Sequence, residues 1–113
     1  MARGLLDQAV KLVTAIVRPS RLDAVVDALA ILGVDRLTVT ETRGFDRSAR
    51  GADATPSAAD MVEVAVADER LQAVMEALRV AAHTGRAGDG MMFVTDLVGA
   101  VRIRNRERGE QAL

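Results

Sequence analysis

The chain of 113 residues contains no cysteine, which excludes disulfides, thiolate nucleophiles and cysteine zinc clusters. It has no tryptophan or tyrosine and only two phenylalanines, so it offers few of the aromatic platforms on which nucleic-acid bases stack. No apolar run approaches the roughly 20 residues of a membrane span, and residues 1–11 lack the charged-then-apolar order of a signal peptide. We therefore expect a cytoplasmic protein that binds no nucleic acid.

Half of the residues are hydrophobic, and nearly all of these are aliphatic. A chain of this length usually forms one domain around one core. The net charge is −1, so no global field attracts DNA or acidic lipid. The basic residues are nevertheless uneven: fourteen of the fifteen are arginine, and four of these fall within residues 102–108.

One nine-residue stretch occurs twice in similar form. RLDAVVDAL at Arg21–Leu29 and RLQAVMEAL at Arg70–Leu78 are identical at six of nine positions. In both copies the apolar residues recur at helical spacing, which predicts two related amphipathic helices. Ser20 and Asp68 precede the two stretches as candidate helix N-caps.

Segments rich in apolar and β-branched residues flank each predicted helix and indicate strands. The predicted order of elements is strand–helix–strand, and it occurs twice. Such a duplicated unit folds as a ferredoxin-like double βαβ sandwich of the α+β class, with a four-stranded antiparallel sheet and two helices on one face. We predict one such domain over residues 11–113, trimeric because the uncovered aliphatic face of the sheet needs cover. The expected strands are Leu12–Val17, Leu37–Glu41, Met61–Val66 and Met92–Asp96.

Two segments interrupt the repeat. Gly44–Asp60 has two glycines, a proline and three aspartates without sustained periodicity, so we expect residues 46–60 to form a mobile, functional loop. Thr84–Gly90 has the sequence TGRAGDG, whose glycines allow successive backbone N–H groups to point into one concavity suited to phosphate. The alternative for this second segment is a plain tight turn between a helix and a strand.

Arg102 and Arg104 stand two residues apart in the basic cluster. In an extended segment they would project from the same side, where two guanidiniums can bind phosphate oxygens. The alternative is a solvent-exposed edge strand whose charges prevent aggregation. No nucleophile–base pair or carboxylate pair has a spacing that indicates catalysis, so we expect a protein that is not an enzyme.

These segments resemble the PII signal-transduction family. The resemblance runs from about Lys11 to Leu113 and includes AIVRPSRLDAV, LTVTETRGF, TGRAGDG and the closing AVRIRNRERGEQAL. TGxxGDG followed by RIR is a specific combination. The resemblance implies a homotrimeric regulatory protein with an adenine nucleotide in each cleft between subunits.

The resemblance also implies which residues line each cleft. Residues 84–91 correspond to the B-loop, and residues 99–113 to a C-terminal loop that reaches the neighbouring subunit's nucleotide. Residues 46–60 correspond to the T-loop, which docks on a partner such as a membrane transporter. The implied nucleotide-binding residues are Thr38, Gly44, Phe45, Asp46 and Arg47 at the base of the long loop, Gly88, Asp89 and Gly90 in the B-loop, and Arg102 and Arg104.

Several features depart from the family pattern. The T-loop is short and has no tyrosine or distal lysine, Met91 replaces the lysine after GDG, and Asp46 replaces a glycine. ATP would need the missing positive charge at its terminal phosphate, so we expect ADP or AMP to bind at least as tightly as ATP. The departures are similar to those of divergent PII-like proteins tied to carboxysomes. This implies bicarbonate as a second effector, held by Arg43 and Arg47.

Two other functions remain open. One is a conventional nitrogen-regulatory PII protein that binds ATP and 2-oxoglutarate. The other is a ferredoxin-like oligomerisation module that binds no nucleotide, for which paired arginines beside a glycine-rich loop have no use. A calorimetric titration with ATP, ADP, AMP and cyclic AMP, with and without bicarbonate or 2-oxoglutarate, would separate them.

Overall fold

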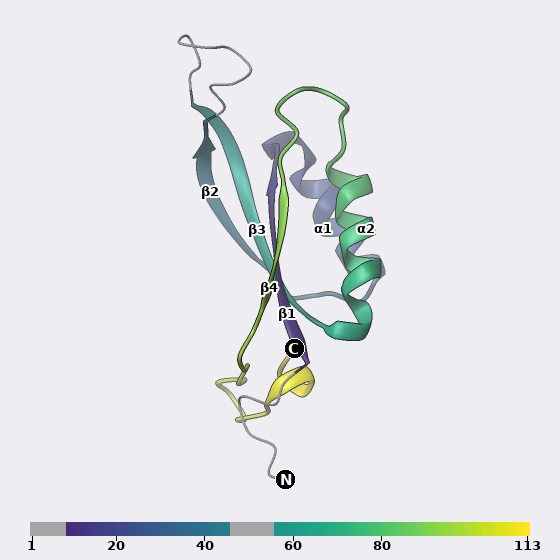
Figure 1. Cartoon of the computed structure of the whole chain (residues 1–113), viewed down its shortest axis with the longest axis vertical. Helices are drawn as coiled ribbons and strands as arrows, with labels where there is room; N and C mark the ends of the chain where they lie inside the picture. The colour runs from purple at the N-terminus through teal and green to yellow at the C-terminus, as the bar shows by residue number, and fades with distance from the viewer. Residues whose placement is uncertain (1–8, 46–55) are drawn as a thin grey trace.

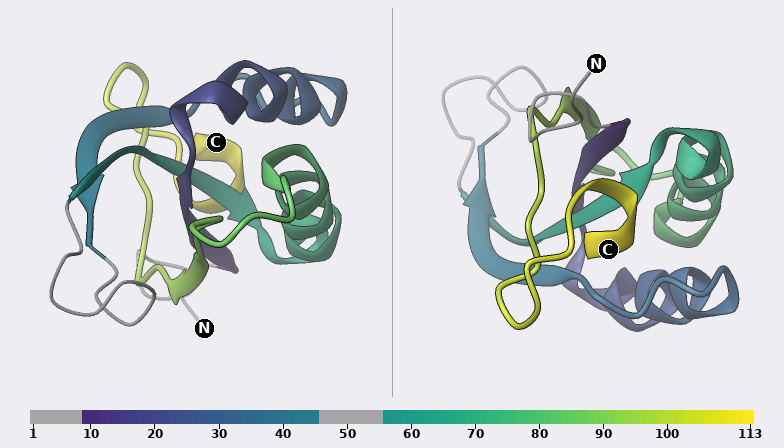
Figure 2. Two further views of the ribbon diagram at one scale, coloured as in Figure 1. Left: turned by 90° about the horizontal axis from the view of Figure 1, so that it is seen from above. Right: turned by 90° about the horizontal axis from the view of Figure 1, so that it is seen from below.

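A computed structural model describes residues 9–45 and 56–113 of the chain. The strands form one sheet in the order β2-β3-β1-β4, with every neighbouring pair antiparallel. Both helices cover the same face of this sheet, as the views along and across it show (Figures 1 and 2). The predicted ferredoxin-like fold is therefore confirmed. The elements are β1 (Val10–Val17), α1 (Leu22–Ile31), β2 (Thr38–Gly44), β3 (Ser57–Ala67), α2 (Leu71–Ala82) and β4 (Met92–Asp96).

The core lies between the sheet and the two helices and is aliphatic, as the composition predicts. Alternate residues of β1 and β3 are buried, and the equivalent positions of the two repeats, Val25 with Val74 and Leu29 with Leu78, are fully buried. Full burial of such a side chain contributes about 1.5–3 kcal/mol. Equivalent residues of the two sequence repeats therefore occupy equivalent positions in the core.

The start of each helix differs from the prediction. Ser20 and Asp68 do not cap the helices, because each lies inside a 3₁₀ turn that leads into the helix, Pro19–Arg21 and Asp68–Arg70. The i→i+3 backbone bonds of such turns take up N–H groups that a cap would otherwise satisfy. The Asp68 carboxylate pairs instead with the Lys11 ammonium group.

The β2–β3 ribbon is longer than predicted. Residues 57–60 were expected in the mobile loop but belong to β3, where Ser57 pairs with Gly44. Val17, the last residue of β1, pairs with Asp60, so the ribbon continues past the end of β1 (Figure 1). The remainder of the predicted mobile loop, residues 46–55, lies outside the described residues.

The segment after β4 is a closed turn rather than an extended strand. Val101 pairs with Arg108 in an isolated antiparallel bridge, and the Arg106 N–H donates to the Arg102 carbonyl at 2.8 Å. The expected extended geometry of Arg102 and Arg104 is therefore wrong, because these backbone bonds close the segment into a turn. A 3₁₀ turn, Gly109–Ala112, follows it.

Candidate functional site

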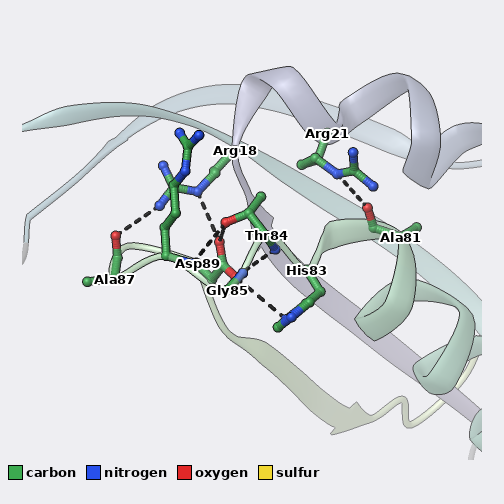
Figure 3. Close-up of polar contacts among 9 residues, drawn as sticks. Arg18, Arg21, Ala81, His83, Thr84, Gly85, Ala87 and Asp89 are labelled. Atoms are coloured by element: carbon green, nitrogen blue, oxygen red, sulfur yellow. Dashed lines mark hydrogen bonds and ion pairs between the residues drawn. The ribbon is translucent and has the colours of Figure 1, made fainter.

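The TGRAGDG loop, Thr84–Gly90, connects α2 to β4 at the end of the sheet where β1 stops (Figure 1). Asp89 organises it from within. Its carboxylate accepts the backbone N–H groups of Thr84 and Gly85, both at 2.9 Å, and the Thr84 hydroxyl. It also accepts the Nε–H of Arg18 at 3.0 Å (Figure 3). Asp89 therefore holds the loop in one conformation.

These donors favour the ionised carboxylate. The Thr84 hydroxyl has the largest effect, followed by the Thr84 backbone N–H and the Arg18 guanidinium, and together they hold the pKa of Asp89 far below its usual range. His83 Nδ1 lies 3.8 Å from the same carboxylate, at the end of α2. Asp89 is thus a fixed negative charge at neutral pH.

Arg18 fastens the loop to the end of β1 and was not singled out from the sequence. Its Nη2 donates to the Ala87 carbonyl at 2.9 Å while its Nε–H binds Asp89. Gly88 has a φ of +104°, and a Cβ there would lie 3.1 Å from Arg18 Nη2. Arg18 stands 71 residues before Asp89, so no local spacing could reveal the contact.

Gly90 has a packing role. A Cβ at this position would lie 1.7 Å from the Ile16 carbonyl oxygen, which no side chain can tolerate. The Ile16 N–H donates to the Met91 carbonyl at 2.8 Å, so the loop and β1 are joined backbone to backbone. The predicted contact of Gly90 with a nucleotide stays a prediction.

The base of the long loop lies at this same end of the sheet. Gly44 ends β2 opposite Ser57, and the Phe45 side chain beyond it is exposed. Asp46 and Arg47, the other candidates of the loop base, lie outside the described residues. We call Gly44, Phe45, Gly88, Asp89 and Gly90 the upper group.

The sequence analysis placed Thr38 at the base of the long loop, and this prediction is wrong. It begins β2 and pairs with Glu63, whereas Gly44 ends the same strand. A strand rises about 3.4 Å per residue, so the two positions are about 20 Å apart. Thr38 lines a hollow of about 1010 Å³ together with Leu113.

Arg102 and Arg104 also lie at this opposite end, where the Leu97 N–H binds the carbonyl of Val10 at the start of β1. The Arg102 side chain is only 13% exposed, donates to the Leu113 carbonyl at 2.9 Å and lies 3.6 Å from Glu107. Arg104 is exposed. Arg102 and Arg104 lie at the opposite end of β1, a strand about 23 Å long, from the upper group, and Thr38 lies at the far end of β2. We call these three residues the lower group.

Residues 9–45 and 56–113 show neither a metal-binding cluster nor a membrane-spanning helix. No three His, Asp or Glu side chains are close enough together to hold a metal ion. None of the helices within these ranges has the length and apolar character that crossing a membrane requires.

The duplicated strand–helix–strand unit, with a glycine loop fixed to the end of β1, defines a ferredoxin-like domain. The family model described as Nitrogen regulatory protein P-II matches residues 10–107. The chain belongs to this family of regulatory signal-transduction proteins.

Comparison with individual proteins supports the same family assignment. The nitrogen regulatory protein GlnK of Escherichia coli K12 is 41% identical over 111 residues, covering 91% of this chain and 99% of the relative. The nitrogen regulatory protein P-II of Rhizobium meliloti is 43% identical over 113 residues, with the same coverage. The crystal structure of Arabidopsis thaliana PII bound to citrate superposes with a TM-score of 0.82 at 36% identity, covering 95% of this chain and 94% of that one.

Proposed function

We propose that the protein is a cytoplasmic, non-enzymatic regulator that binds an adenine nucleotide between two copies of itself. The observation that supports this is the separation of the upper and lower groups. They lie at opposite ends of one sheet, so one chain cannot bring both to one small ligand. A second copy can complete the site by placing its lower group against the first copy's upper group.

The chemistry of the two groups is complementary. The upper group supplies a glycine loop, whose backbone N–H groups suit phosphate, and the exposed Phe45 ring. The lower group supplies guanidiniums, and a charge-assisted bond from such a donor to phosphate contributes about 1.5–3 kcal/mol. A nucleotide whose phosphates contact the glycine loop of one copy and the arginines of a second copy would use both groups.

The outer face of the sheet supports assembly into a homotrimer. Register places Thr14 of β1, Glu63 of β3 and Phe93 of β4 side by side on the face away from the helices. Phe93 is 49% exposed there. Packing of three copies through this face would cover it and create three equivalent clefts.

The preferred nucleotide is ADP or AMP rather than ATP. Met91 follows GDG, and its side chain is 63% exposed without offering positive charge to a terminal phosphate. Met91→Lys should therefore shift the preference toward ATP, measured by calorimetry as the ratio of the two affinities. A strong preference of the parent for ATP, unchanged by the substitution, would contradict this assignment.

The output of the regulator is the loop between β2 and β3, residues 46–56, which would respond to the nucleotide at its base and dock on a membrane transporter or another protein. Bicarbonate is the proposed second effector, with Arg43 at the end of β2 as one of its ligands. The proposal predicts that adding bicarbonate at fixed pH and ionic strength changes the affinity for ADP. An unchanged affinity would remove bicarbonate from the proposal.

The shared site can be tested by mixing two defective variants. Arg104→Ala removes a lower-group guanidinium, and Met91→Glu puts a repelling charge beside the upper group. Each variant alone should bind ADP about ten- to a hundred-fold more weakly than the parent. Mixed oligomers, formed by unfolding and refolding the two together, should regain tight binding in a minority of clefts, where intact halves meet.

Arg108→Ala, in the same basic segment but outside the lower group, is the matched control and should bind ADP as the parent does. Three results would overturn the proposal: a parent that binds no adenine nucleotide, an Arg104→Ala variant that binds as the parent does, or mixed oligomers that regain no binding.

A further inference from the structure

The thioethers of methionine are the only sulfur groups of this chain, because it has no cysteine. Of its five methionines, Met1 lies outside the described residues. Met75 and Met92 pack against the hydrophobic core, and Met61 of β3 is half-buried. Met91 differs from these three, because it is 63% exposed. The most accessible of the described methionines is thus the one that follows the glycine loop.

The backbone directs the Met91 side chain away from the core. The bond from the Ile16 N–H to the Met91 carbonyl, at 2.8 Å, continues the β1–β4 ladder one residue beyond the pair of Ala15 and Met92. Successive side chains of a strand point to opposite faces, and Met92 packs against the core on the helix side. Met91 therefore lies on the outer face of the sheet. The second copy of the proposed assembly approaches from this same face.

We propose that Met91 is a site of reversible oxidation, which regulates the binding of phosphate-bearing ligands at the glycine loop. A two-electron oxidant such as hydrogen peroxide oxidises the thioether. A lone pair of the sulfur forms the S–O bond, the O–O bond breaks, and the second oxygen leaves as water with the proton of the first. The regulatory part of this proposal rests on the proposed function, whereas the oxidation itself does not.

The modification can be reversed by methionine sulfoxide reductases. Two thiols supply the electrons, the sulfoxide oxygen leaves as water, and the thiols become a disulfide. The thioether is thereby restored, so the site can respond repeatedly to a change in oxidising conditions.

Oxidation changes what Met91 presents to the loop. The thioether is apolar and a weak acceptor, whereas the sulfoxide is polar, with a partial negative charge on its oxygen. Phosphate oxygens have the same character, so the sulfoxide competes with them for the backbone N–H groups of the loop and repels them. Oxidised Met91 should lower the affinity for ADP about two- to tenfold, which corresponds to one ordinary hydrogen bond.

A bound nucleotide should in turn protect Met91. An oxidant must reach the sulfur to react, and a nucleotide beside the loop covers that side chain. The ligand-free protein should therefore be oxidised faster than the ADP-bound protein. Met91 would then respond to oxidising conditions chiefly when the nucleotide is scarce.

The first test treats the full chain with limiting hydrogen peroxide, with and without ADP, and follows each methionine by mass spectrometry of its peptides. Met91 should be oxidised several times faster than Met75 and Met92, and ADP should slow its oxidation. Because Met91 and Met92 are adjacent, fragment ions assign the added oxygen. A rate for Met91 no higher than those of Met75 and Met92 would overturn the proposed site, whether or not ADP binds.

The second test measures ADP binding by calorimetry before and after oxidation. The oxidised parent should bind ADP more weakly, and reductase with a dithiol should restore its affinity. Met91→Leu has no thioether at this position, so its own affinity, whatever its value, should not change on peroxide treatment. Met75→Leu is the matched control and should respond as the parent does. An unchanged ADP affinity after full oxidation of Met91, or a response of Met91→Leu equal to that of the parent, would overturn the regulatory role.

A parent that binds no ADP would refute the proposed nucleotide site without refuting the oxidation. NMR spectra of the ligand-free chain then decide whether the sulfoxide acts on the loop. Oxidation should shift the amide resonances of Gly85 and Gly88 in the loop and leave that of Val25 in the core unchanged. Loop resonances that stay in place would overturn the proposal.

Discussion

At the scale of single residues, Asp89 has a role different from the one its motif suggests. The motif indicates a residue facing a ligand, whereas the carboxylate accepts four donors from its own loop and Arg18. Its first effect on any ligand is therefore to fix the positions of the backbone groups that would contact that ligand.

Asp89→Asn should destabilise the protein at neutral pH, because an amide cannot accept from all of these donors. The folded-state pKa of Asp89 is lowered, so its contribution is present above the unfolded pKa of about 3.9 and is lost as pH falls below it. Denaturant titrations at neutral and acid pH should show the stability difference between variant and parent shrinking below about pH 4. A stability difference that does not change with pH would contradict this prediction. Asp27→Asn, on the exposed side of α1, is the control and should change the stability little at either pH.

Gly90→Ala should lower the free energy of unfolding by about 3 kcal/mol, because its methyl group would overlap the Ile16 carbonyl and force two backbones apart. The midpoint of denaturant unfolding measures this. Gly44→Ala is the matched control, since a Cβ there meets no atom within 4 Å. Equal stability of the two variants would show that β1 and the loop are not in close contact.

At the scale of elements, the repeat predicted both helices and the four strands. In α1, α2, β1 and β3 buried aliphatic positions recur with the period of the structure, whereas β2 and β4 have no buried residue and were indicated by their apolar and β-branched residues. The first residues of β3 were missed because Ser57 and Ala58 have little strand propensity; pairing with β2 holds them in place. The candidate site was predicted less completely. Its glycine loop was evident from the motif, whereas Arg18 reaches that loop only through the fold.

The C-terminal turn was missed although a signal for it was present. Asn105 is a turn-forming residue, and its side-chain oxygen accepts the Glu107 N–H at 3.0 Å, which brings the chain round. The alternating Arg102 and Arg104 favoured an extended segment, and this pattern was given more weight than Asn105 alone. A short alternating pattern is weak evidence for a strand when a turn-forming residue follows it.

Arg106→Gly should stabilise this turn. Arg106 has a φ of +65°, a left-handed conformation that costs a residue with a side chain roughly 1–2 kcal/mol and costs glycine nothing. After the extra chain entropy of glycine, we expect a gain of about 0.5–1 kcal/mol in denaturant titrations. Arg108→Gly, at an extended φ of −124°, should give no gain. A gain at both positions would indicate that charge, not backbone strain, is responsible.

At the scale of the whole molecule, the outer face of the sheet decides assembly. Phe93→Asp should convert the proposed trimer to monomers in light scattering, because an unpaired buried carboxylate costs roughly 3–5 kcal/mol. Val80→Asp is the control: Val80 is 58% exposed on α2, and its substitution should leave the assembly intact. A Phe93→Asp variant of parental mass would place the contact between copies elsewhere.

The strand order has a consequence for how the chain can fold during synthesis. β1 and β2 belong to the first repeat yet do not touch: β3 lies between them, and Val13 of β1 pairs with Val64 and Val94, both from the second repeat. The two repeats are therefore interlocked, and neither can complete a sheet alone. The first half leaves the ribosome with both edges of β1 unpaired, and the sheet closes only when the last strand emerges. Such distant pairing slows folding, since long loops must close before the contacts that stabilise them form.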